Sequence, residues 1–286
     1  MRVGAVIVLY NPSLKEANEL INTVSKMVDT LSIVDNSLVA SKVTLPPENT
    51  HYHHFKSNKG VAAAQNVGLS DLLADECAYA LLLDQDSEVP SSMVPQLVNK
   101  LRAYPDSLVA VGPRIVCSFT NDEQHPKVQK ALLTENELSF VPQIISSGMM
   151  ISLAKLSAVG LKEESLFIDG VDHEWCWRAR LNSYQIAIAN DVKMRHTMGE
   201  HRSNFLGVTY KVGKPIRLYY QFRNIFILSR REYVPRYWKL RNLGILPLRV
   251  LVNLLNEKDK ILRAKYMWQG ICDGIMKRAG AYKVWH

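Results

Sequence analysis

An apolar run that ends in two acids is the feature of this sequence that most constrains its fold. Residues 80–87 read ALLLDQDS, so Asp84 and Asp86 follow four apolar residues. Such a run is typical of a buried strand, and ionised carboxylates are costly to bury. We therefore expect both acids at the exposed carboxyl end of a strand, where open α/β sheets bind ligands. A solvated turn after the strand is the alternative.

Strand and helix patterns alternate around this run. Apolar strand patterns cover residues 3–9, 31–34, 51–55, 80–83 and 108–111, and apolar residues recur at helical spacing over 14–28, 61–74 and 93–101. This order predicts an α/β fold with a parallel, doubly wound sheet over the first hundred residues. No Gly-x-Gly-x-x-Gly or Gly-Lys-Ser/Thr loop follows the first strand, which argues against a dinucleotide oxidoreductase or a P-loop enzyme.

The charge of the chain is unevenly distributed. Residues 1–192 contain 15 Lys and Arg against 22 Asp and Glu, whereas residues 193–286 contain 20 against 5. A basic tail of this kind indicates an anionic partner surface, and without a helix-turn-helix, zinc or single-strand-binding signature we expect membrane and no nucleic acid. A solvated basic face is the alternative. The four dispersed cysteines suggest no disulfide framework and are typical of a reduced, cytoplasmic protein. No run reaches the ~20 apolar residues of a membrane span.

Polar residues follow each of the first four predicted strands. They are Tyr10 and Asn11, Asp35 and Asn36, Asn58 and Gly60, and Asp84 and Asp86. Asn, Asp and Gly are also ordinary turn residues, so each pair is weak evidence by itself. The carboxyl ends of parallel strands meet at one edge of the sheet, and the four pairs together predict a single ligand crevice.

Six segments make the sequence resemble glycosyltransferase family 2, the inverting enzymes with a GT-A fold. These are VGAVIVLYNP (3–12), IVDNS (33–37), NKGVAAAQNVGL (58–69), LLLDQDS (81–87), FIDGVDHEWCWRAR (167–180) and RHTMGE (195–200). Within the family the chain looks most like bacterial rhamnosyltransferases of O-antigen and capsule assembly. The resemblance implies a GT-A catalytic domain over residues 1–205, in which residues 1–112 bind the nucleotide and residues 113–205 bind the acceptor. A basic helical region, 206–286, would follow.

The resemblance also assigns the crevice residues. Tyr10 and Asp35 would hold the nucleobase, with Asn11 and Asn36 nearby. The nucleotide side would be lined by Asn58, Gly60, Gln65 and Asn66. Asp84 would contact ribose or a metal-bound water, Asp86 would ligate Mg²⁺ or Mn²⁺, and His196 would add a third metal or diphosphate contact. A hydrogen-bonded histidine at a strand end is the alternative for His196.

The segment FIDGVDHEWCWRAR contains the expected catalytic base. Asp172 and Arg178 match the family's acidic motif, in which arginine follows the acid by six residues, although this chain has Val171 where the family has Glu. A carboxylate must accept the acceptor hydroxyl's proton during inverting displacement, and Asp172 is the candidate. Glu174 corresponds to a second acid, but a helical i,i+4 ion pair between Glu174 and Arg178 is an alternative.

The resemblance places a further group of residues around the two sugars. They are Ser147, Gly148, Glu174, Trp175, Arg178 and Arg223. A bulge without a ligand is the alternative for Ser147 and Gly148, and a buried structural arginine for Arg223. Residues 117–143 are expected to be a long connection that shapes the acceptor site.

Residues 243–260 are expected to form one amphipathic helix in the basic tail. Its polar face would contain Arg249, Asn253, Asn256 and Lys260, and the segment is flanked by Trp238, Arg236, Lys239 and Arg241. This pattern suits a helix lying in the plane of a membrane; packing on the catalytic domain or on a second copy in a homo-oligomer are alternatives.

Together these features predict a metal-dependent, inverting transferase. Its donor would be dTDP-β-L-rhamnose and its acceptor a lipid-linked saccharide, at the cytoplasmic face of the membrane. Another nucleotide-sugar as donor, such as a UDP-hexose or UDP-N-acetylhexosamine, a nucleotidyltransferase and a non-catalytic membrane-binding module are the alternatives.

Overall fold

The computed structural model describes residues 1–117, 131–196, 201–205 and 208–284. A mixed sheet forms its centre, with the strand order β3-β2-β1-β4-β9-β6-β10-β8-β7. Its first four strands are parallel, as the sequence predicted, and are β3 (Thr50–His54), β2 (Thr30–Asp35), β1 (Val3–Leu9) and β4 (Tyr79–Asp84). β5 (Ser87–Glu88) pairs with β10.

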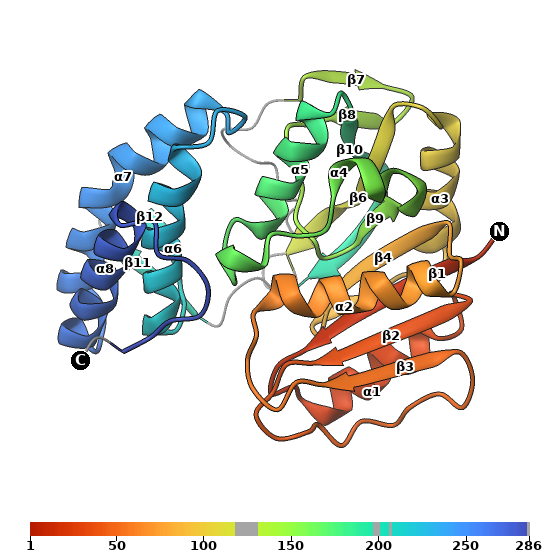
Figure 1. The fold of residues 1–286 in the computed structure, drawn as a ribbon, viewed down its shortest axis with the longest axis horizontal. Helices are drawn as coiled ribbons and strands as arrows, with labels where there is room; N and C mark the ends of the chain where they lie inside the picture. Colours follow the sequence, from red (N-terminus) through yellow and green to blue (C-terminus); the bar gives the residue numbers. More distant parts are fainter. Residues whose placement is uncertain (118–130, 197–200, 206–207, 285–286) are drawn as a thin grey trace.

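Helices cover both faces of the sheet (Figure 1). One core joins the sheet to α1 (Leu14–Val24) and α3 (Met93–Ala103). A second core, on the opposite face, joins it to α2 (Val61–Ala74), α4 (Leu156–Val159) and α5 (Val171–Leu181). Alternate residues of a strand point to opposite faces, so the continuous apolar runs of β1 and β4 contribute to both cores. The α/β layering predicted from the sequence is confirmed.

One antiparallel strand interrupts the parallel order. β9 (Met149–Ser152) lies between β4 and β6 (Leu108–Cys117) and is antiparallel to both. Gly148, just before β9, has a φ of +82° and its N–H donates to the Leu82 carbonyl at 2.9 Å. An added Cβ at Gly148 would lie 2.8 Å from the Pro113 ring, so this close approach requires glycine.

The edge of the sheet beyond β6 is built from later segments. β10 (Gln185–His196) runs parallel to β6, and β8 (Leu138–Phe140) pairs antiparallel to β10. β7 (Leu133–Glu135) closes this edge, and β11 (His201–Phe205) pairs with β12 (Val208–Val212) in a separate hairpin. Some of the expected connection 117–143 therefore forms strands, and residues 118–130 within it lie outside the described residues.

Three helices complete the chain and lie together at one end of the molecule (Figure 1). They are α6 (Pro215–Ser229), α7 (Arg236–Leu255) and α8 (Lys260–Ile275). The predicted single helix over 243–260 is wrong in its bounds, because α7 begins seven residues earlier and ends at Leu255, before a turn that contains Asp259 with a φ of 55°. Within the described residues, no helix combines the length and apolarity needed to cross a bilayer.

Candidate active site

Three acids gather at the carboxyl end of β4. Asp84 is its last residue, Asp86 follows in the turn, and Asp172 lies in the first turn of α5. The pKa of Asp84 is raised to about 7, first by burial and then by the charges of Asp172 and Asp86, while Arg217 acts in the opposite direction. Residues about ninety positions apart are thus close enough to form one strongly negative site.

Asp172 is held by a serine from the turn before β9. The Ser146 hydroxyl donates to Asp172 Oδ1 and lies 3.4 Å from Gln65 Oε1. Ser146 and Gln65 are buried, whereas Asp172 is only partly buried. The unpaired N–H groups of the first turn of α5 also favour a carboxylate at this position. Asp172 therefore has a fixed orientation beside the acidic site, which suits a proton acceptor.

Substitution of Asp84 by Asn is expected to stabilise the metal-free protein at neutral and higher pH. The folded-state pKa of Asp84 is raised, so the protonated carboxyl contributes its full stabilisation below about pH 4. This contribution is lost as the pH rises through 7. The gain in unfolding free energy for the Asn variant should therefore grow with pH and reach about 1–2 kcal/mol near pH 8. Urea unfolding in EDTA between pH 4.5 and 8 measures it. A difference that does not vary with pH would contradict the assigned burial.

The loop after β2 is organised by the buried carboxylate of Asp35. Ser37 and Ser41 donate backbone N–H groups to it at 3.0 and 2.6 Å, and the Tyr52 hydroxyl donates at 3.0 Å. Burial would raise the pKa of Asp35, but the hydrogen bonds from Ser37 and Ser41 outweigh burial and lower it. Asp35 is thus an ionised acceptor at the carboxyl end of β2.

Tyr10 and Asn11 lie next to this loop. The Asn11 N–H donates to Ser37 Oγ at 2.8 Å, and the Tyr10 N–H donates to the side chain of Gln85 at 2.7 Å. The ring of Tyr10 is 42% exposed. Because Gln85 separates the two acids of the DQD sequence, these contacts join the ends of β1, β2 and β4 into one edge, as the sequence predicted.

Asn36, Asn58 and Gly60 form another section of this edge. Asn58 Oδ1 accepts hydrogen bonds from Asn36 Nδ2 and from the Gly60 N–H, both at 2.9 Å. Gly60 has a φ of +91°, and an added Cβ would lie 2.6 Å from the Phe167 carbonyl oxygen. The loop that opens α2 therefore packs directly on the segment leading to α5, which brings the two predicted motifs together.

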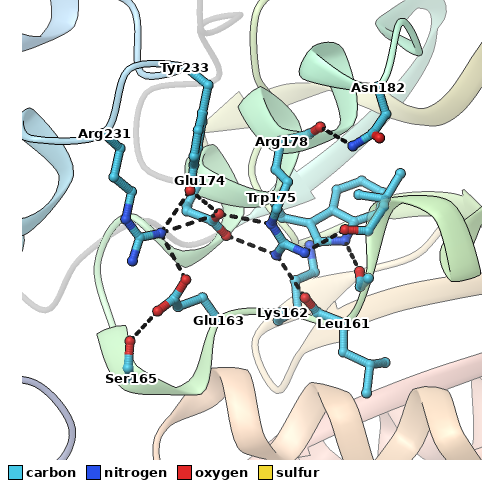
Figure 2. Close-up of polar contacts among 12 residues, drawn as sticks. Leu161, Lys162, Glu163, Ser165, Glu174, Trp175, Arg178, Asn182, Arg231 and Tyr233 are labelled. Carbon is cyan, nitrogen blue, oxygen red and sulfur yellow. Dashed lines mark hydrogen bonds and ion pairs between the residues drawn. The ribbon is translucent and has the colours of Figure 1, made fainter.

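Glu174, Trp175 and Arg178 lie inside a buried network (Figure 2). Glu174 is fully buried, and its carboxylate accepts hydrogen bonds from Arg178 at 2.9 and 3.0 Å and from the Tyr233 hydroxyl at 2.7 Å. Arg231 lies 3.4 Å from Glu174 and pairs with Glu163 at 2.8 Å. The structure therefore contains the helical i,i+4 ion pair between Glu174 and Arg178 that the sequence offered as the alternative. Glu174 also connects α5 to the segment after α6.

Replacing Glu174 with Ala is expected to destabilise the fold by about 3–5 kcal/mol, because it leaves Arg178 without its buried counter-charge and removes one of the two acids around Arg231. Glu19→Ala, at an exposed helical glutamate of α1, is the matched control and should change the unfolding free energy by less than about 0.5 kcal/mol. Chemical unfolding of both variants measures the difference. Equal small effects would show that the network contributes little to stability.

Trp175 and Asn66 are also engaged within the protein. Trp175 is fully buried and donates to the Gly160 carbonyl at 2.9 Å, and the Lys162 ammonium lies 4.4 Å from its ring centroid. Asn66 donates to the Lys162 carbonyl and to Glu164, and accepts from the Lys162 N–H. These contacts anchor α2 to the 160–164 loop, so a ligand role for either residue stays a prediction.

Arg223 is a fully buried residue of α6. Its guanidinium donates to the carbonyls of Ser165 and Leu166, at 3.2 and 2.9 Å, and to that of Gly280. The rings of Tyr219 and Tyr220 lie 5.2 and 5.1 Å from it. The structure therefore agrees with the alternative of a buried structural arginine. Its expected contact with the acceptor stays a prediction.

The remaining predicted sugar residue, Ser147, is buried at the same edge. Its hydroxyl lies 2.7 Å from that of Ser87, which follows Asp86 directly. Asp86 also lines a cavity of about 1050 Å³, in which Lys15, Lys193 and Arg195 are accompanied by Glu16, Glu19 and Glu88. The space beside Asp86 is therefore lined by charges of both signs.

The donors present fit a hard divalent cation. Asp84 and Asp86 supply the carboxylate oxygens that Mg²⁺ and Mn²⁺ prefer, and such a cation would neutralise the charges of Asp86 and Asp172 that, after burial, raise the pKa of Asp84. No three His, Cys, Asp or Glu side chains converge as a complete ligand set in the region of the chain that the structure describes. The backbone of His196 pairs with Ser87, next to Asp86, but its side chain lies outside the described residues.

Two cations at the start of α6 were not predicted from the sequence. Lys214 Nζ lies 6.0 Å from the ring centroid of Tyr10, and Arg217 pairs with Asp169 at 2.8 Å while its charge opposes the rise in the pKa of Asp84. The available signal was the sequence KPIR, which places basic residues around a proline at a helix start. A tail segment thus contributes positive charge to the acidic edge.

Solved structures share this fold at low sequence identity. GalNAc-T7, solved with UDP, GalNAc and Mn²⁺, superposes with a TM-score of 0.58 at 13% identity, over 97% of this chain and 56% of that one. Residues 1–349 of S. aureus TarS give 0.58 at 15% identity, over 97% and 82%. Their complex with UDP-GlcNAc gives 0.56 at 16% identity, over the same shares. These likenesses show the GT-A fold.

Sequence comparison gives the family. The sequence profile of glycosyl transferase family 2 matches residues 6–156. The dTDP-rhamnosyl transferase RfbF of Shigella flexneri is 30% identical over 285 residues, which cover 96% of this chain and 95% of that protein. With the GT-A fold and an acidic site at the expected strand end, this chain belongs to glycosyl transferase family 2.

Proposed function

We propose that this glycosyltransferase transfers L-rhamnose from dTDP-β-L-rhamnose to a lipid-linked saccharide, with inversion at the anomeric carbon. The observation that supports the reaction type is that Asp172, held by Ser146 in the first turn of α5, lies near enough to Asp84 and Asp86 at the end of β4 for their charges to interact. The choice of donor rests on the 30% identity with a dTDP-rhamnosyl transferase across nearly the whole of both chains.

Asp172 is the proposed general base. An acceptor hydroxyl that donates to the free oxygen of Asp172 loses its proton as the oxygen attacks the anomeric carbon opposite the leaving dTDP. The Ser146 hydroxyl, which donates to Oδ1, fixes which oxygen remains for the acceptor. Ser146 is therefore a positioning residue that acts through Asp172.

The nucleotide is proposed to lie along the carboxyl ends of β1, β2 and β4. Tyr10 supplies an exposed ring for the base. Asp35, an ionised acceptor with a lowered pKa, is proposed to exchange one of its present hydrogen bonds for one from a base N–H. Asn36 and Asn58 fix the neighbouring loop. Lys214 and Arg217 bring positive charge toward the diphosphate position.

Asp84 and Asp86 are the residues proposed to hold Mg²⁺ or Mn²⁺. When bound, the cation neutralises charge that grows on the diphosphate as the glycosidic bond breaks. The structure of GalNAc-T7, which shares the fold, contains Mn²⁺ with UDP. His196 is kept as a proposed third contact.

A donor panel tests the proposed specificity. The release of dTDP or UDP is measured with dTDP-rhamnose, UDP-glucose and UDP-GlcNAc, each with and without saccharide acceptors. Turnover should be fastest with dTDP-rhamnose. A clear preference for a UDP-sugar, such as the UDP-GlcNAc bound by TarS, would instead favour the alternative of a family 2 transferase with a UDP-sugar donor.

The lipid-linked acceptor requires the enzyme to work at a membrane. We propose that it acts as a peripheral protein on the cytoplasmic face, since the basic region after residue 192 suits an anionic surface.

A further inference from the structure

The exposed side of α7 is aliphatic. Leu240, Leu248, Leu251 and Leu255 are 73, 50, 48 and 57% exposed, and Gly244 lies in open space between them. Their spacing places them on one face, because residues three and four apart neighbour each other on a helix. This face occupies most of the length of the 20-residue helix.

The opposite side of α7 is mixed. Leu246 is buried in a core with α6 and α8, and Trp238 and Val250 pack against this core. Asn242 is also buried and donates to the Trp238 carbonyl at 2.9 Å, and Asn253 accepts from Arg263 of α8 at 3.0 Å. A surface helix normally has one apolar stripe, which it turns inward. The leucine face is a second, exposed apolar surface of α7, which calls for an apolar partner.

The two ends of this leucine face differ in charge. Arg236 and Arg241 are exposed in the first two turns, whereas Lys258 and Lys260 beyond the last turn alternate with the acids Glu257 and Asp259. An anionic bilayer offers both complements at once, acyl chains for the leucines and phosphates for the two arginines. A second copy in parallel contact would instead bring Arg236 and Arg241 of both helices together, which costs free energy.

We propose that the outward face of α7 docks in the plane of an anionic bilayer. Leu240, Leu248, Leu251 and Leu255 enter the boundary between headgroups and acyl chains, and the flanking cations meet lipid phosphates. Removal of the leucines from water and attraction of the arginines to lipid phosphates act together, so the face supplies reversible binding. This surface rests on the proposed peripheral location and names the helix face that provides it, but it does not depend on which sugar is moved.

The docked helix is connected directly to the helix that holds the proposed base. Trp238 of α7 packs edge-on against Trp177 of α5 with ring centroids 5.1 Å apart, and the Tyr237 hydroxyl lies 3.3 Å from the Gln143 amide oxygen. Docking through α7 therefore places Asp172 at a defined height above the membrane, where a lipid-linked acceptor is found.

Cosedimentation of the full-length protein with vesicles tests this surface without any sugar. We expect binding to phosphatidylglycerol vesicles and at least tenfold weaker binding to phosphatidylcholine vesicles. The triple variant Leu240→Gln, Leu248→Gln, Leu251→Gln should lose at least tenfold in phosphatidylglycerol affinity. The matched control Leu38→Gln, Leu73→Gln, Leu181→Gln changes exposed leucines of the catalytic domain and should stay within twofold. The double variant Arg236→Gln, Arg241→Gln should bind more weakly and show a smaller salt dependence.

Three outcomes would overturn the proposal. One is equal binding to neutral and anionic vesicles, and another is an equal loss in the leucine variant and its control. The third is a parent protein that sediments as a dimer without lipid and a leucine variant that sediments as a monomer. This result would assign the leucine face to contact with a second copy. Thermal unfolding confirms that the variants are folded, and transfer to a water-soluble acceptor separates loss of docking from failure of the proposed reaction.

Discussion

Transfer by the Asp172→Asn variant should be slower than that of the parent by about 10²-fold or more, the usual contribution of a general base. Asn keeps the shape of Asp172 and still accepts the hydrogen bond from Ser146, but it cannot take the acceptor's proton. The loss should therefore fall on kcat, with the KM for the donor changed only a few-fold. Steady-state kinetics with a water-soluble acceptor measure both constants.

The control for this experiment is Asp106→Asn, at an exposed acid after α3, which should transfer at nearly the parental rate. Ser146→Ala gives a second reading, because it removes the group that orients Asp172 without removing the base. Its loss should be smaller than that of Asp172→Asn. Parental kcat in Asp172→Asn would exclude Asp172 as the base and direct attention to another acid of the cluster.

Metal removal should have an effect of similar size. Excess EDTA or the substitution Asp86→Ala should reduce transfer to background, because the leaving diphosphate then lacks its neutralising cation. Added Mg²⁺ or Mn²⁺ should restore the EDTA-treated parent and leave Asp86→Ala inactive. Calorimetric titration of Mn²⁺ with dTDP provides a readout besides activity and should show binding only in the parent. Full activity in EDTA would contradict a metal-dependent reaction.

Much of the fold was predictable because local patterns decide it. The buried runs of β1 and β4 and the helical spacing in α1, α2 and α3 were identified with small errors at their ends. The carboxyl-end rule for parallel strands then gathered Tyr10, Asp35 and Asp84 at one edge. These features depend on the spacing of apolar residues and on the alternation of strands with helices, which implies parallel strands. Both can be read from a single sequence.

The burial of individual polar residues was not predictable. Glu174 and Arg223 have the residue types of ligand contacts, but packing places each of them in a closed protein network. The contact between Ser146 and Asp172 joins segments 26 residues apart, and the orientation of α7 depends on how α6 and α8 pack. Periodicity shows that a helix has an apolar side, but only the tertiary structure shows which side faces out.

The most direct test of inverting rhamnosyl transfer is the structure of the product. Labelled dTDP-β-L-rhamnose is incubated with the enzyme, Mg²⁺ and a panel of lipid-linked saccharides, and the labelled product is characterised by mass and by the anomeric signals of its NMR spectrum. The expected result is that one acceptor of the panel gains one rhamnose in α linkage, with release of dTDP. A β-linked product, or transfer of a different sugar from its own nucleotide while rhamnose is left untouched, would contradict it.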